Sequence, residues 1–216
     1  LGKSIRIEEL EELLDFRSVT SEFALAKAAL AISGFSPAAA AWPAGITLRG
    51  MLEHFGGGID LTTLAAIPKG SGLGTSSIVR AALLAVVQRT MGAALSRQEL
   101  FHGVLRLEQA LTTGGGWQDQ VGGVVDGVKV VSAEPGLVPD TRIHYVPADV
   151  LDPAANGGAT LLYYTGITRV AKNILQQVVG RYLDHQRSAL ATLRRLHALP
   201  HQVADAMARK DLSAFG

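Results

Sequence analysis

Residues 68–77 read Pro68-Lys69-Gly70-Ser71-Gly72-Leu73-Gly74-Thr75-Ser76-Ser77, a glycine-rich run between two apolar segments. Before it, residues 59–67 follow the period-two pattern of a β-strand with one more apolar face. Its two faces are Ile59, Leu61, Thr63, Ala65 and Ile67 on the more apolar side, and Asp60, Thr62, Leu64 and Ala66 on the other. After it, the strongly apolar residues 78–87 predict a buried helix capped by Thr75 or Ser76. A strand, a glycine loop and a helix N-terminus direct backbone N–H groups and a positive dipole end at one spot. We therefore expect an anion to bind there.

Two familiar phosphate-binding patterns do not fit this run. A P-loop carries Lys and Ser or Thr directly after its last glycine, whereas Lys69 precedes the glycines. The dinucleotide fingerprint requires a glycine where Thr75 stands. The glycines could also form only a tight turn, but the three hydroxyl residues that follow exceed what a turn requires. The predicted phosphate-binding residues are Gly70, Ser71, Gly72, Leu73, Gly74, Thr75, Ser76 and Ser77.

A carboxylate lies on the apolar face of the next predicted helix, residues 96–112. The helix begins with a capping box, in which Ser96 and Glu99 each satisfy an unpaired backbone N–H group. At about 100° per residue, Glu108 points to the same side as Phe101. Because an unpaired buried carboxylate is costly, Glu108 needs a cation or strong donors. That cation could be a core lysine or arginine, or Mg²⁺, which binds few carboxylates together with phosphate oxygens.

The composition describes a globular chain without a strong electrostatic preference. Its 216 residues, 48% of them hydrophobic, can bury the core of one domain or two small ones. A formal net charge of +1 gives no general attraction to nucleic acid or to anionic membranes. The absence of cysteine excludes disulfides and thiolate chemistry. Since no uncharged apolar run approaches the roughly 20 residues of a membrane span, we expect a soluble, cytoplasmic protein.

Helical and strand patterns both occur in the rest of the chain, which predicts an α+β fold. We expect helices around residues 8–14 and 23–32, strands at 128–131, 143–146 and 159–165, a helix from Arg169, and loops at 36–45 and 56–58. The Pro- and Gly-rich break near residues 135–160 suggests a domain boundary, with domains at 1–150 and 151–216.

Three blocks of this sequence resemble the kinases that include galactokinase, homoserine kinase, mevalonate kinase and phosphomevalonate kinase (the GHMP kinases). Within that group they are most similar to the L-fucose kinases. The blocks are residues 67–77, with Pro, three residues and Gly-Leu-Gly before hydroxyl residues, residues 107–109 with 112–120, and residues 161–169. The resemblance implies a two-domain GHMP kinase fold, with an N-terminal domain like the second domain of a ribosomal protein and a ferredoxin-like, helix-rich C-terminal domain. An early Arg-x-Asp-x-x-Gly-Gly segment and a late Gly-rich segment are missing, so we expect truncation at both ends.

The resemblance also implies roles for individual residues. Ser76 and Glu108 match the Mg²⁺ ligands of the family, and the glycine-rich loop matches its ATP-phosphate site. Asp119 matches the catalytic base, although a glycine-rich context also suits a turn-forming aspartate. Lys69 could neutralise phosphate charge during catalysis or simply be solvated.

Further residues are candidates for sugar contact. Gly116 and Trp117 lie in the middle block, where Trp117 could stack on the sugar or pack in the core. Arg169 lies in the last block and could contact phosphate or substrate, or be an ordinary surface arginine.

The implied reaction transfers phosphate from ATP to the anomeric hydroxyl of L-fucose and gives L-fucose 1-phosphate, which feeds GDP-fucose synthesis. Two alternatives remain open at this stage. One is a D-glycero-D-manno-heptose 7-phosphate kinase, whose members have a similar glycine loop and Gln-Asp-Gln segment. The other is a non-catalytic nucleotide- or sugar-binding module of a larger protein.

Overall fold

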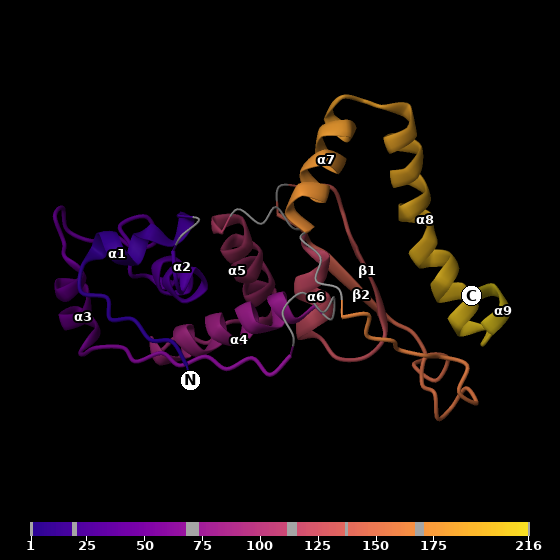
Figure 1. The fold of residues 1–216 in the computed structure, drawn as a ribbon, viewed down its shortest axis with the longest axis horizontal. Helices are drawn as coiled ribbons and strands as arrows, with labels where there is room; N and C mark the ends of the chain where they lie inside the picture. Colours follow the sequence, from indigo (N-terminus) through magenta and orange to yellow (C-terminus); the bar gives the residue numbers. More distant parts are fainter. Residues whose placement is uncertain are drawn as a thin grey trace. The chain divides into compact units, whose positions relative to one another are not determined.

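A computed structural model of the chain describes residues 2–18, 21–67, 74–111, 116–136, 138–166 and 171–215, with the backbone alone for 171–176. The described residues up to Val124 form one compact unit, and those from Val125 onward form a second (Figure 1). The first compact unit therefore ends before the Pro- and Gly-rich break. The assignment of family domains to residues 1–150 and 151–216 stays a prediction.

Helices build the first unit. They are α1 (Leu10–Leu14), the short 3-10 helix η1 (Asp15–Arg17), α2 (Ala24–Ser33), α3 (Leu48–Phe55), α4 (Thr75–Thr90), α5 (Arg97–Ala110) and α6 (Gln118–Val124). Helix α4 packs against α2, α5 and α6. The helices predicted around residues 8–14, 23–32 and 96–112 are confirmed as α1, α2 and α5.

The core of the first unit lies where α2, α4 and α5 meet. Its buried side chains there are Ala28, Ala29, Leu83, Val87 and Leu107. A second cluster, of Leu13, Phe35, Leu48 and Met51, packs α1 and α3 together. Since α4 contributes Leu83 and Val87 to the first cluster, apolar packing holds this helix against α2 and α5.

The start of α4 differs from the prediction that Thr75 or Ser76 caps it. Gly74 is the N-cap residue, with φ of 67°, and both hydroxyl residues lie inside the helix. The amides of Ser77 and Ile78 donate to the carbonyl of Gly74 at 3.1 and 3.3 Å. A left-handed backbone costs an L-residue roughly 1–2 kcal/mol, so glycine is the suitable residue at this turn.

Among its described residues, the second unit contains a small sheet and three helices. Strands β1 (Lys129–Ala133) and β2 (Thr141–Tyr145) pair antiparallel, with Val131 opposite Ile143. They confirm the strands predicted at 128–131 and 143–146. The helices are α7 (Ala171–Leu183), α8 (Arg187–Ala208) and α9 (Leu212–Phe215), and α7 confirms the helix expected after Arg169.

Two other predicted strands are wrong. The described parts of 59–67 and 159–165 have no strand hydrogen bonding, and side chains such as Leu64 (93%) and Leu161 (86%) are exposed. A strand needs a neighbour to bond its N–H and C=O groups, and within the described residues the sheet is limited to β1 and β2. The mixture of helices and a sheet agrees with the α+β class. Across the same residues, no helix is long and apolar enough to cross a membrane.

Candidate active site

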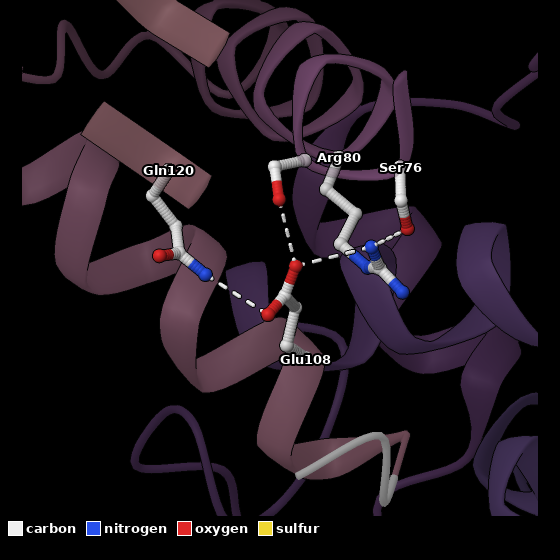
Figure 2. Close-up of polar contacts among 5 residues, drawn as sticks. Ser76, Arg80, Glu108 and Gln120 are labelled. Carbon is white, nitrogen blue, oxygen red and sulfur yellow. Dashed lines mark hydrogen bonds and ion pairs between the residues drawn. The ribbon is translucent and has the colours of Figure 1, made fainter. Parts of the chain in front are cut away.

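Glu108 is a buried carboxylate on α5 that is held by side chains from α4 and α6 (Figure 2). On α4, the Ser77 hydroxyl and Arg80 Nη1 donate to Glu108 Oε1 at 2.9 and 3.1 Å. On α6, Gln120 Nε2 donates to Glu108 Oε2 at 2.9 Å. Two neighbouring helices thus orient both oxygens of one carboxylate. We call Ser77, Arg80, Glu108 and Gln120 the Glu108 cluster.

The ion pair between Arg80 and Glu108 is buried, with side chains 10% and 7% exposed. Burial lowers the pKa of the Arg80 guanidinium, and the negative charge of Glu108 opposes that shift. Arginine nevertheless stays protonated at ordinary pH. The sequence left open whether a core lysine or arginine or a metal ion would neutralise Glu108. In this structure a core arginine, Arg80, does so.

Ser76 connects the cluster to the surface. Its hydroxyl accepts a hydrogen bond from the same Arg80 Nη1 that contacts Glu108 (Figure 2). Ser76 itself is exposed and lies one helical turn before Arg80. The Ser76 hydroxyl and the Glu108 carboxylate therefore converge on one positively charged nitrogen. Two oxygens directed at one positive charge can also suit a metal cation, and the role of Ser76 and Glu108 as metal ligands stays a prediction.

Asp119 lies in the first turn of α6, next to Gln120, and is exposed. Within the described part of the chain, no hydrogen-bond partner is found for its carboxylate. One turn later, a Cβ on Gly123 would lie 2.9 Å from Ile78 Cγ1 and 3.7 Å from the Gly74 carbonyl oxygen, so α6 approaches the start of α4 closely. Residues 119 and 123 share a helix face. That face of α6 is turned toward the N-terminus of α4.

The remaining predicted site residues divide into two groups. Gly116 is exposed and Trp117 is half-buried, and both directly precede α6. The catalytic candidate Lys69, the phosphate-binding candidates Gly70, Ser71, Gly72 and Leu73, and the substrate candidate Arg169 lie outside the described residues.

Ser77 differs from the other predicted phosphate ligands. It is 2% exposed, its hydroxyl donates to Glu108 and its amide donates to the Gly74 carbonyl. Both donors of Ser77 are engaged inside the protein. This geometry favours a role in holding Glu108 over the predicted contact with phosphate.

Sequence reasoning assigned no role to Arg80 or Gln120. Arg80 could have been found as the charged residue of the apolar run 78–87, one turn after Ser76. Gln120 is 0% exposed, and its Oε1 has no partner among the described residues. A glutamine after a glycine-rich segment gives no such signal, because its burial depends on how α6 packs on α5.

Comparisons with known proteins found one family model and two similar proteins. Residues 43–127 match the GHMP kinases N terminal domain. The chain is 40% identical over 216 residues to a Bacteroides fragilis protein named L-fucokinase/L-fucose-1-P guanylyltransferase. It is 31% identical over 220 residues to an Arabidopsis thaliana protein named bifunctional fucokinase/GDP-fucose pyrophosphorylase.

Both alignments cover 100% of this chain but only 23% and 19% of the two relatives. The chain thus spans about a fifth of the length of these curated relatives. No solved structure matches it. The matched segment contains helices α4 and α5, helix α6 and the whole Glu108 cluster. The likeness to the GHMP kinases N terminal domain therefore covers residues 43–127.

Proposed function

We propose that this chain forms part of an ATP-dependent sugar kinase that phosphorylates the anomeric hydroxyl of L-fucose. The match to the GHMP kinase N-terminal domain and the similarity to two proteins named as fucokinases support this activity. The observation that carries the proposal is the convergence of Ser76 and Glu108 on one positive charge beside the N-terminus of α4. L-Fucose 1-phosphate would be the product, and the chain would form part of a two-domain GHMP kinase fold.

Phosphoryl transfer requires neutralisation of phosphate charge and an attacking oxygen placed in line. The first backbone N–H groups of a helix have no partner within the helix, so the start of α4 around Ser76 can donate to phosphate oxygens. The glycine-rich run before Gly74 would complete this cradle. Lys69, ahead of the glycines, would add positive charge.

Ser76 and Glu108 would hold Mg²⁺, which neutralises phosphate charge when it is bound. Gln120 and Ser77 fix the Glu108 carboxylate, so that it does not have to reorient. Asp119 would accept the proton of the anomeric hydroxyl, because its exposed carboxylate lies on the face of α6 that is turned toward α4. Gly116, Trp117 and Arg169 are the proposed sugar contacts.

The test is ADP release by the intact protein with Mg²⁺ and L-fucose, D-arabinose, galactose or D-glycero-D-manno-heptose 7-phosphate. We expect turnover selective for L-fucose. Asp119→Asn removes the proposed base, so kcat should fall by about 10²- to 10⁴-fold. Asp15→Asn, at another exposed aspartate of the first unit, is the matched control and should leave kcat unchanged.

The other outcomes are informative. Turnover selective for the heptose phosphate would replace the substrate and keep the mechanism. Mg²⁺-dependent ATP binding without turnover of any sugar would contradict the kinase and favour a nucleotide-binding module. Full activity in Asp119→Asn would remove Asp119 from the role of base.

A further inference from the structure

Arg80 occupies the position at which the two proposed metal ligands meet. Its Nη1 donates to the Ser76 hydroxyl and, at 3.1 Å, to Glu108 Oε1 (Figure 2). One nitrogen thus contacts both oxygens that a divalent cation would use. A guanidinium and a metal ion cannot share this space.

The surroundings of Arg80 satisfy its guanidinium incompletely. Arg80 is 8% exposed, and its Nε has no hydrogen-bond partner among the described residues. A buried donor without a partner costs free energy, so Arg80 is held mainly by the charge of Glu108. A stronger cation at the same oxygens would release this cost if the long, flexible side chain withdrew.

Glu108 does not depend on Arg80 alone for its orientation. Gln120 holds Oε2, and the Ser77 hydroxyl holds Oε1. Both contacts can persist when Arg80 leaves. Ser76 is exposed at the start of α4, which gives an ion from solvent access to this end of the cluster.

We propose that Arg80 is an internal counter-ion that occupies the cation position between Ser76 and Glu108 and competes with Mg²⁺ for it. This inference rests on the proposed function in so far as Mg²⁺ is the competing cation. Metal binding must break the Arg80–Glu108 ion pair, so the wild-type chain binds the free metal weakly. A variant that lacks the Arg80 charge binds the metal more tightly.

The test measures the thermal unfolding midpoint of the intact protein against Mg²⁺ or Mn²⁺, without nucleotide or sugar. Arg80→Met removes the positive charge of the buried Arg80–Glu108 ion pair, so the midpoint should fall in the absence of metal. Added metal should then raise it with an apparent Kd at least about tenfold lower than that of the wild type. Arg89→Met, at an exposed arginine of the same helix, should behave as the wild type does.

Two more variants make the result specific. The double substitution Arg80→Met with Glu108→Gln should lose the metal response, since the carboxylate is gone. Arg80→Gln keeps a neutral N–H donor for Glu108 and is the second variant if Arg80→Met does not fold. It should show the same gain in metal affinity.

The proposal is overturned if the wild type and Arg80→Met respond equally to metal, or if neither charge-removing variant responds. Failure of both variants to fold even with excess Mg²⁺ also overturns it, because the metal should replace the missing positive charge. None of these measurements uses sugar turnover. An inactive kinase with the expected metal response would contradict the proposed function alone, and an active kinase without that response would contradict the inference alone.

Discussion

At the residue scale, the burial of Glu108 shows how the chain replaces water around a carboxylate. The donors come from Ser77, Arg80 and Gln120, so α4 and α6 together supply what solvent would otherwise provide. The ion pair also makes the stability of the fold sensitive to substitution, because a buried charge that loses its partner is strongly destabilising. The cluster therefore couples the packing of α4, α5 and α6 to the chemistry of the site.

Glu108→Gln should destabilise the protein more than any exposed charge substitution. It leaves the buried Arg80 guanidinium without its anion, which we expect to lower the free energy of unfolding by about 3–5 kcal/mol. Urea denaturation measures this loss. Glu53→Gln is the control, since Glu53 pairs with Arg49 at 3.1 Å in an exposed contact and should cost at most about 1 kcal/mol. Similar losses in the two variants would show that the Arg80–Glu108 pair is not coupled to folding.

At the element scale, local signals were sufficient to predict helices α1, α2 and α5. The start of α5 was predictable because the capping box is local: Glu99 N donates to Ser96 Oγ at 3.3 Å, and Ser96 N donates to Glu99 Oε2 at 2.8 Å. Helix α3 was missed because it is short. Its cap, in which Thr47 Oγ1 accepts from Gly50 N at 3.1 Å, lies close to an Ala- and Pro-rich segment that resembles a loop.

The failed strands have a different physical cause. Alternating apolar side chains show that a segment suits a sheet, but they do not show that another strand is available to pair with it. The pattern at 59–67 therefore predicted a strand that the described residues do not form. The carboxylate of Glu108 was predictable from helix periodicity, whereas its partner Arg80 depends on the packing of α4 against α5.

The capping box of α5 should make stability depend on pH. Hydrogen bonds from the Ser96 side chain, and then from its backbone N–H, lower the pKa of Glu99 below its ordinary value of 4.5. A lowered carboxylate pKa gives stabilisation that is present above the unfolded-state pKa and is lost as pH falls through the folded-state value.

The comparison is between the wild type and Glu99→Gln, which accepts hydrogen bonds but does not titrate. Thermal unfolding midpoints between about pH 6 and pH 3 should fall more steeply in the wild type. Parallel curves for the two proteins would mean that the ionised Glu99 contributes nothing to the cap.

At the scale of the whole molecule, the two compact units bury very different amounts of side chain. Helix α4 buries six residues, including Leu83, Leu84 and Val87, whereas α8 buries only Ala206 and Met207 among its described side chains. Pro200 also interrupts the backbone hydrogen bonds of α8. Segments with few buried contacts open locally at low free-energy cost.

Hydrogen exchange should reveal this difference. Amides in the central turns of α4 should exchange at least about tenfold more slowly than those of residues 190–199 in α8. Mass spectrometry of peptides from the two helices measures the rates. Equal protection of both helices would show that the two compact units unfold as one cooperative body.

Four consecutive apolar residues, Leu161, Leu162, Tyr163 and Tyr164, are exposed by 86, 83, 78 and 58%. Segments of this kind, with high β-propensity and no charge, add readily to the edges of sheets in other molecules. For the chain handled alone, we expect aggregation through this segment to limit the protein concentration and the time for which a sample can be stored. A lysine substitution at Tyr163, which carries a charge into the middle of the segment, is the first change to make for a soluble preparation.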